Sequence, residues 1–222
     1  MFLTSCIIVL IQLNYNKIGV QMRNQGQAKI TQEKDRKRVI QYQNGNGRTG
    51  KRNIALLMFS HLCGTRSKEM AELSVGDVYS IKEGYVYDEA LLTREMTKGA
   101  KQRTIFLKHP KLKDSLNKYL KEREDRGEVL ENDAPLFRSE RNVRFTGQTM
   151  SVVFRRMYDS VGLKKMSSHS GRRTYATSLD EQGVGIKNIQ QLMGHSNIST
   201  TSIYIDNNPI RLAEINKNLK LV

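Results

Sequence analysis

The sequence predicts an α+β domain that is mostly α-helical and carries a small antiparallel sheet. Apolar residues recur at spacings of three and four after Pro110 and after Gly147, which is the pattern of amphipathic helices. Segments 92–96 and 103–107 instead have the character of strands. The Gly-containing, Lys-rich stretch 97–102 between them predicts a hairpin turn. The chain shows no internal repeat.

Caps and helix breakers predict the other elements. Asn53 is expected to cap a helix that ends at Gly64. A second helix is expected from about Thr65 until Gly76 breaks the pattern, and the stretch 44–47 predicts a loop. Toward the C-terminus the predicted helices are Ser167–Gln182, Ile186–Met193, Ile198–Ile205 and Pro209–Leu219.

Length and charge restrict the function. A chain of 222 residues is long enough for one large domain with its own core. Lys and Arg number 37 against 22 Asp and Glu, a net charge of +15, and this excess indicates a polyanionic partner. Only Cys6 and Cys63 are present, which excludes a disulfide framework and favours a reducing, cytoplasmic location.

The N-terminal segment 1–28 is expected to be an extension of the domain. Its apolar run of about a dozen residues is shorter than the roughly 20 that cross a bilayer, so no membrane partner is expected. No basic residue precedes the run, which disfavours a signal peptide. The segment is interpreted as a docking strand or helix, or as an upstream extension with Met22 as an alternative start.

Several kinds of site are not indicated. The four histidines and Cys63 have no metal-ligand spacing, so no metal is expected. The chain has no phosphate-binding Gly-Lys loop, no dinucleotide-binding glycine pattern and no nucleophile elbow. No cofactor is therefore expected.

One set of residues points to phosphate chemistry. His169 and Arg172 lie three apart in the first turn of a predicted helix, where free N–H groups favour an anion. Other pieces stand in order around this pair. They are Gly64-Thr65-Arg66 with Glu69, Lys98 in the hairpin turn, and Gly194-His195 nine residues before Tyr204. Together, from about Lys29 to Pro209, they resemble the tyrosine recombinase (phage integrase) family.

The resemblance implies a DNA breaking–rejoining enzyme fold with a three-stranded antiparallel sheet. It also implies a reaction in which a tyrosine attacks a DNA phosphodiester and forms a 3′-phosphotyrosyl intermediate, without ATP or metal. The implied catalytic residues are Tyr204 as nucleophile, Arg66 and Arg172 as phosphate ligands, His195 as a further phosphate donor, His169 as proton acceptor or phosphate ligand, and Lys98 as general acid. Glu69 is expected to orient the arginine box, the Gly64-Thr65-Arg66 segment, and not to react itself.

Two assignments have competitors within the chain. Tyr175, three residues after Arg172, is an alternative nucleophile, although core packing explains it as well. Lys101 and Arg103 lie in the same hairpin as Lys98 and could take its role.

The resemblance is incomplete at some positions. Thr65 replaces a usual leucine, Met193 stands where leucine is common, and Arg173 stands where histidine is frequent. None of these changes removes a catalytic group. Family members usually carry a separate core-binding domain, for which there is no room upstream of Lys29. The chain is therefore interpreted as a solitary catalytic domain, residues 29–222, and an accessory DNA-binding protein is a possible partner.

Double-stranded DNA is the expected partner, contacted mostly through phosphates. The predicted contacts are Arg36, Lys37, Arg38, Arg48, Lys51, Arg52, Lys101, Arg103, Arg155 and Arg156. Gln148, Thr149 and Ser151 either reach base edges or form a solvated helix start. The resemblance further implies a tetramer on two DNA sites, with the segment 209–219 docked on a neighbouring subunit or on its own domain.

Three other functions compete with a recombinase. The same domain could serve as a DNA-binding regulator that does not use catalysis, or as a type IB topoisomerase. A basic protein tethered by the apolar leader is the third alternative.

Overall fold

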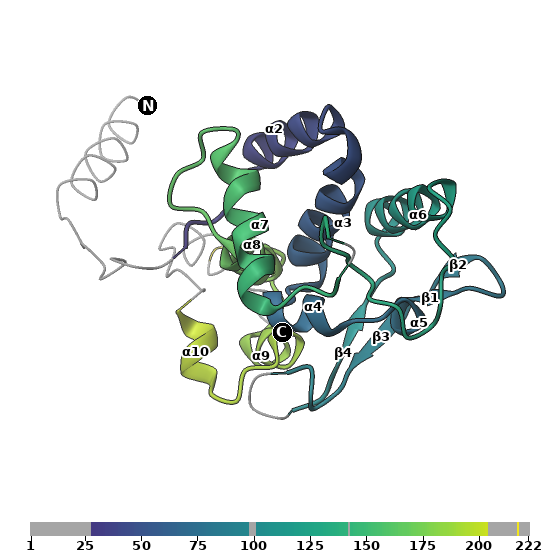
Figure 1. Cartoon of the computed structure of the whole chain (residues 1–222). Helices are drawn as coiled ribbons and strands as arrows, with labels where there is room; N and C mark the ends of the chain where they lie inside the picture. Colours follow the sequence, from purple (N-terminus) through teal and green to yellow (C-terminus); the bar gives the residue numbers. More distant parts are fainter. Residues whose placement is uncertain (1–27, 98–100, 142, 204–216, 218–222) are drawn as a thin grey trace.

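The computed structural model describes residues 28–97, 101–141, 143–203 and 217 (Figure 1). The helices are α2 (Glu33–Asn44), α3 (Gly47–Cys63), α4 (Ser67–Glu72), α5 (Val75–Val78), α6 (Pro110–Asp125), α7 (Gly147–Asp159), α8 (Ser168–Glu181), α9 (Ile186–Met193) and α10 (Ile198–Ser202). The strands are β1 (Tyr79–Ser80), β2 (Tyr85–Val86), β3 (Glu89–Leu92) and β4 (Arg103–Phe106). The mostly helical α+β class is confirmed.

Helix α3 is the centre of the fold. It packs against α6 on one side and against α8 on the other, and α2 lies across its N-terminal half (Figure 1). Leu56, Leu57 and Phe59 are fully buried along it. The ring of Phe59 meets Phe137 edge-to-face at 5.9 Å between centroids. Because the C-terminal half of α3, from Ala55 to Cys63, buries side chains on several faces, other elements cover it from several sides.

The start of α3 differs from the prediction, whereas its end agrees. The helix begins at Gly47, with Asn46 as N-cap, and not at Asn53. Asn53 is buried within the helix, where its side chain accepts hydrogen bonds from Arg52 and donates one to Gln43. Tertiary contacts thus use the side chain that the sequence suggested as a cap. At the other end Gly64 takes φ 58°, the left-handed conformation that closes a helix.

The sheet also departs from the prediction. Within the described residues the strands form two separate antiparallel pairs, β1–β2 and β3–β4, and not one three-stranded sheet. Strand β3 pairs Leu92 with Arg103, so the first strand of the hairpin ends where the sequence suggested it would begin. On β4, Arg103 and Ile105 face the interior and alternate with exposed Thr104 and Phe106.

The C-terminal helices follow the prediction closely. Thr146 caps α7, accepting a hydrogen bond from the Thr149 amide at 3.1 Å, and Ser167 caps α8. Helix α9 spans the predicted range, and α10 ends at Ser202. Of the predicted helix 209–219 only Lys217 is described, and the segment 1–27 lies outside the described residues. Among the described residues, no helix has the length and apolar character to cross a membrane.

Candidate active site

Arg66 is positioned by the end of α3 and the start of α4. The left-handed turn at Gly64 redirects the chain, and Arg66 follows as the N-cap residue of α4. Glu69, one turn into α4, accepts hydrogen bonds from the Arg66 amide at 2.8 Å and from its guanidinium at 2.7 Å. The Arg66 side chain is 22% exposed and the Glu69 side chain is fully buried. The buried Glu69 therefore fixes the partly exposed side chain of Arg66.

A second arginine shares the same carboxylate. The guanidinium of Arg103, on β4, donates at 2.8 Å to the Glu69 oxygen that also accepts from the Arg66 amide, while the Arg66 guanidinium binds the other oxygen. Burial opposes ionisation of Glu69. The guanidinium groups of Arg103, Arg172 and Arg66 outweigh it and hold the pKa of Glu69 below its usual value. Glu69 is thus an anion enclosed by cations, and positive charge remains in excess around it.

Arg172 connects three segments that are distant in sequence. It comes from the second turn of α8 and is 2% exposed. Its guanidinium donates to the carbonyl oxygens of Gly64 and Met193, and to Nε2 of His195 at 2.9 Å. The end of α3, the end of α9 and His195 are therefore fixed relative to one side chain.

The contact with Arg172 defines the tautomer of His195. A guanidinium has no acceptor, so Nε2 of His195 accepts and the ring proton lies on Nδ1. Nδ1 then donates to the hydroxyl of Thr201 at 2.9 Å. Burial lowers the pKa of His195 to about 4, and the charges of Arg172 and Arg66 act in the same direction. His195 is neutral at pH 7.

His169 is more exposed than Arg172 and His195. It is exposed in the first turn of α8, one turn before Arg172. Partial burial lowers its pKa below the ordinary histidine value, and the charges of Arg172 and Arg66 lower it further. A neutral imidazole next to two arginines can accept a proton while the arginines bind an anion.

Three serines hold the first turns of α4, α7 and α8 together. Ser151 of α7 donates to Ser67 of α4 at 3.0 Å, and its hydroxyl lies 3.2 Å from that of Ser168 of α8. Ser151 is half-buried in these contacts, whereas Gln148 and Thr149 are exposed. Ser151 therefore lies in a helix contact, and only Gln148 and Thr149 remain available to base edges.

The alternative nucleophile Tyr175 is packed against the site. A Cβ at Gly64 would lie 2.4 Å from the Tyr175 ring, so the ring covers the turn that precedes Arg66. Burial raises the pKa of the Tyr175 phenol, which makes it a poorer nucleophile. Tyr204 and Lys98 lie outside the described residues.

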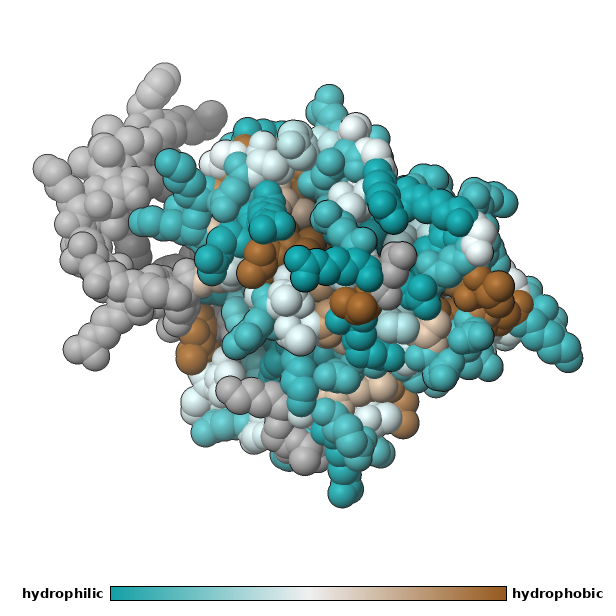
Figure 2. Space-filling view, in the orientation of Figure 1, coloured by the Kyte–Doolittle hydropathy of each residue, from teal (hydrophilic) through white to brown (hydrophobic). Residues whose placement is uncertain are grey.

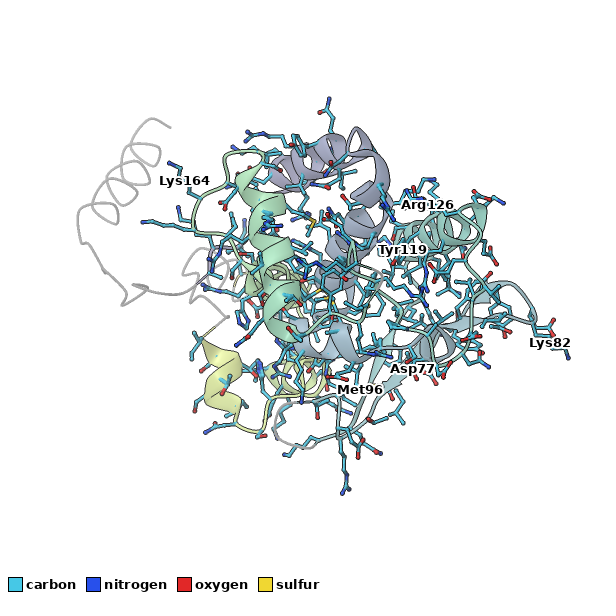
Figure 3. The ribbon with its side chains drawn as sticks, in the orientation of Figure 1. Asp77, Lys82, Met96, Tyr119, Arg126 and Lys164 are labelled. Atoms are coloured by element: carbon cyan, nitrogen blue, oxygen red, sulfur yellow. The ribbon has the colours of Figure 1, made fainter. Side chains whose placement is uncertain are left out.

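The base of the hairpin that carries Lys98 is nevertheless described. The Thr97 hydroxyl donates to the Lys101 carbonyl at 2.9 Å, and Lys68 of α4 donates to the Glu95 carbonyl at 3.1 Å. Figure 3 labels Met96 beside α4 at this end of the hairpin. These contacts anchor the hairpin next to the arginine box.

Most of the predicted DNA-contact residues are at the surface. The exposed ones are Lys37, Arg38, Arg48, Lys51, Lys101, Arg155 and Arg156, and Arg36 is partly buried. Arg36 and Arg38 also donate to the Thr31 and Val161 carbonyls, both at 2.7 Å. The face that presents α7 in Figure 2 is largely hydrophilic.

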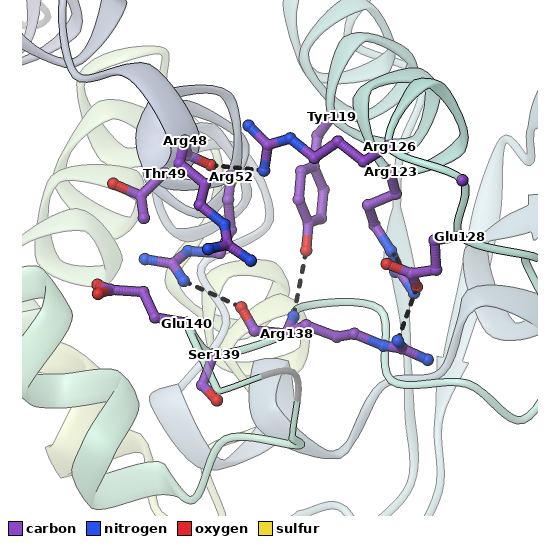
Figure 4. A pocket seen from close by; sticks show the side chains of 11 residues that line it. Arg48, Thr49, Arg52, Tyr119, Arg123, Arg126, Glu128, Arg138, Ser139 and Glu140 are labelled. Atoms are coloured by element: carbon purple, nitrogen blue, oxygen red, sulfur yellow. Dashed lines mark hydrogen bonds and ion pairs between the residues drawn. The ribbon is translucent and has the colours of Figure 1, made fainter.

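Arg52 and Arg103 differ from this set because both are buried. Arg52 donates to the Asn53 side chain and to the Arg138 carbonyl, in a cavity of about 330 Å³ between α3 and α6 (Figure 4). The prediction of surface phosphate contacts is at odds with this burial. On β4, the alternation Arg103-Thr104-Ile105 was a signal in the sequence that Arg103 shares the inward face of Ile105.

We refer to the arginines around that cavity as the α3–α6 cluster: the buried Arg52 and Arg123, the part-buried Arg138 and the exposed Arg126, with Glu128. Glu128 accepts from both Arg123 and Arg138, while Arg123 also donates to the carbonyls of Pro135 and Leu136. Most of these donors are occupied by protein groups. Within the described residues, no group of three His, Cys, Asp or Glu side chains is placed to bind a metal.

Comparison with known proteins identifies the family. Residues 29–211, which are most of the chain, match the phage integrase family. The chain belongs to the phage integrase family. Among curated proteins similar to it, the tyrosine recombinase XerC of Caldanaerobacter subterraneus subsp. tengcongensis is 33% identical over 172 residues, or 75% of this chain and 45% of the relative. The tyrosine recombinase XerA of Thermococcus kodakarensis is 31% identical over 175 residues, 78% of this chain and 57% of the relative.

Solved structures of the phage integrase family agree with the fold. A crystal structure of XerA recombinase has a TM-score of 0.67 and 26% identity, covering 88% of this chain and 65% of its own. XerH site-specific recombinase, bound to its palindromic difH substrate, has a TM-score of 0.66 at 23% identity and covers 87% of this chain and 54% of its own. This second likeness shows the fold alone. The chain spans about half the length of the two curated relatives.

Proposed function

We propose that this chain is a site-specific DNA recombinase or integrase that breaks and rejoins DNA through a 3′-phosphotyrosyl intermediate. The observation that carries the proposal is that Arg66, Arg172 and His195 lie together near the buried carboxylate of Glu69. Two guanidinium groups offer planar donors to the non-bridging oxygens of a phosphodiester, where negative charge grows in the transition state. Family membership and recombinase relatives support the same conclusion.

The proposed first step forms one phosphorus–oxygen bond and breaks another. The Tyr204 oxygen attacks phosphorus, the phenol proton passes to His169, and the 5′ oxygen leaves with a proton from Lys98. The bond energy is kept in the phosphotyrosyl ester, so the reaction needs neither ATP nor a metal ion. The 5′-hydroxyl of a second strand then reverses the step and releases Tyr204.

The proposed assembly acts on double-stranded DNA. Exposed basic residues on α2, α3 and α7 supply phosphate contacts, and Gln148 and Thr149 of α7 are candidates for contact with base edges. We propose residues 29–222 as the catalytic unit, four copies of which join two DNA sites in the cytoplasm. An accessory DNA-binding protein would supply the grip of a core-binding domain.

Trapping the covalent adduct tests this proposal. The protein is incubated with nicked duplexes from the flanks of its gene, made with ordinary or 5′-bridging phosphorothiolate linkages, and adducts are separated on a denaturing gel. We expect an adduct that is lost in Tyr204→Phe and in Arg172→Ala and kept in Tyr175→Phe. No adduct, with salt-sensitive DNA binding intact, would favour the non-catalytic regulator. An adduct kept in Tyr204→Phe and lost in Tyr175→Phe would identify the other tyrosine as nucleophile.

The joining of strands from two different sites distinguishes a recombinase from the topoisomerase alternative. A recombinase joins strands from two sites, so its products contain exchanged flanks. A topoisomerase changes linking number and returns every strand to its own partner. Recombinant junctions in the product, detected by amplification across them, support the recombinase.

A further inference from the structure

Arg103 is a buried arginine with an unusual set of partners. Its side chain is 7% exposed and reaches from β4 into the space between α4 and α9. One terminal nitrogen donates to Glu69 at 2.8 Å, and the other donates to the Leu192 carbonyl at 2.6 Å. Both terminal nitrogens are engaged by protein groups, so Arg103 has little capacity left to bind a DNA phosphate.

The two partners belong to the two sides of the candidate site. Glu69 is the carboxylate that also holds Arg66: its other oxygen accepts from the Arg66 guanidinium, and the oxygen shared with Arg103 accepts from the Arg66 amide. Leu192 lies three residues before His195, at the C-terminal end of α9. Arg103 therefore links the segment that positions one phosphate ligand to the segment that positions another.

The stem of Arg103 fits tightly against the turn that leads to His195. Gly194 adopts φ 60°, and a Cβ at this position would lie 2.6 Å from Cδ of Arg103 and 3.1 Å from its Nε. A side chain at position 194 would displace the arginine or the turn. The absence of a Cβ at Gly194 is thus required by the close approach of Arg103, in addition to the positive φ.

The fork of a guanidinium suits this role better than an ammonium. Two nitrogens in one plane bind a carboxylate on α4 and a carbonyl on α9 at the same time, so the distance between the two partners is fixed. A lysine carries one nitrogen and would hold one partner firmly. The Nε of Arg103 is buried without a hydrogen-bond partner among the described residues, so the arrangement is not optimised for stability alone.

We propose that Arg103 is a positioning residue that sets Arg66, through Glu69, and His195, through the end of α9, in fixed relation to the phosphate. This inference rests on the proposed recombinase function. Arg103 acts through donors that stabilise charge on the non-bridging oxygens, and not through protonation of the leaving group. Preset donors need no reorganisation when the charge develops, which is why their alignment affects the rate.

The test compares two substrates under single-turnover conditions. A 5′-bridging phosphorothiolate leaves as a thiolate and needs no proton, so it relieves a leaving-group defect only. We expect Arg103→Met to lower the cleavage rate constant by about 10- to 100-fold on both the ordinary and the phosphorothiolate duplex. Lys98→Met is the reference whose defect the phosphorothiolate relieves. The Kd for DNA and its salt dependence should be unchanged in Arg103→Met.

Arg123→Met is the matched control for loss of a buried arginine. Arg123 is 5% exposed and also binds one carboxylate and backbone carbonyls, but in the α3–α6 cluster. Cleavage per folded molecule should be unchanged in this variant. Arg103→Lys keeps the charge without the fork and should fall between wild type and Arg103→Met, which retains the test if Arg103→Met does not fold.

A double variant tests the route through Glu69. If Arg103 acts through that carboxylate, Glu69→Gln combined with Arg103→Met should cleave no more slowly than the slower single variant. Relief of the Arg103→Met defect by the phosphorothiolate would overturn the inference, as would a flatter salt dependence of binding or an equal loss in Arg123→Met. Wild-type protein that cleaves neither substrate would refute the proposed function itself, whereas a fully active Arg103→Met would refute this inference alone.

Discussion

Arginines gather at both ends of helix α3, yet the groups that they contact differ. At the N-terminal end, the α3–α6 cluster uses its guanidinium groups on Glu128 and on backbone carbonyls (Figure 4). At the C-terminal end, a single carboxylate, Glu69, serves both Arg66 and Arg103, and Arg172 lies nearby. Arginines outnumber carboxylates in both groups, and at the C-terminal end the guanidinium of Arg172 is also hydrogen-bonded to the imidazole of His195.

The ends also differ in their titratable neighbours. His61, His169 and His195 gather at the C-terminal end, whereas the described residues that line the cavity of the α3–α6 cluster include no histidine. Buried arginine alone therefore does not define a site for chemistry. The neutral imidazoles beside the arginines distinguish the candidate active site from the α3–α6 cluster.

The largest expected effect is on the arginine that organises the site. Arg172→Lys should lower the rate of adduct formation by about 10²- to 10³-fold, because one ammonium cannot hold Gly64, Met193 and His195 together and also meet the phosphate. Arg123→Lys, at the other end of α3, should lower the unfolding free energy and leave the rate unchanged. Equal losses in the two variants would remove the distinction between the ends. Single-turnover cleavage and urea unfolding measure both.

The second expected effect is on acid stability. Burial lowers the pKa of His61 to about 4 in the folded protein, against about 6.5 when unfolded. Below pH 6.5 the unfolded chain binds the proton more tightly, so stability present above that pH is lost as pH falls through about 4. His61→Gln lacks the titrating imidazole and should avoid up to about 3 kcal/mol of this loss. Urea unfolding from pH 7 to pH 4 measures it.

His195 contributes in the same window, since burial and Arg172 lower its pKa to about 4 as well. The His61→Gln variant should therefore show a reduced acid dependence and not a flat one. An acid dependence identical to that of wild type would contradict the burial of His61 between Thr31 and Leu57.

The third expected effect concerns the packing of α8 on α3. A Cβ at Gly171 would lie 2.3 Å from the Ser60 hydroxyl and 2.8 Å from Nδ1 of His61. Gly171→Ala should destabilise the protein by about 1–3 kcal/mol. It should also slow cleavage, because the same turn of α8 carries Arg172. Adding Ser60→Ala removes the nearest atom and should restore part of the stability; no restoration would place the conflict elsewhere. Urea unfolding and single-turnover cleavage measure these effects.

The smallest expected effect is on the serine contact between α4, α7 and α8. Ser151→Ala removes the hydroxyl that joins Ser67 and Ser168 and should lower the unfolding free energy by about 1 kcal/mol. The control Val152→Ala, at an exposed position of the same helix, should change it by less than about 0.5 kcal/mol. Thermal unfolding checks both, and equal values would show that Ser151 holds nothing together.

Local patterns in the sequence determined the helices, the order of the motifs and the family. Helix periodicity and capping residues indicated α7, α8 and α9, because these signals act within a few residues of the chain. The left-handed glycine that ends α3 was readable for the same reason. The H-x-x-R pair and the G-H pair were visible as spacings, although their contacts were not.

The tertiary structure decided which polar side chains face inward. Asn53 and Arg52 were predicted as a cap and a DNA contact, and both are interior groups because Gln43 and Arg138 approach them from other segments. Glu69 meets Arg103 across 34 residues, and Arg172 meets Gly64 across 108. A hydrogen bond between distant segments leaves no periodic trace in the sequence, since its partner is set by how the helices pack and not by the neighbouring residues.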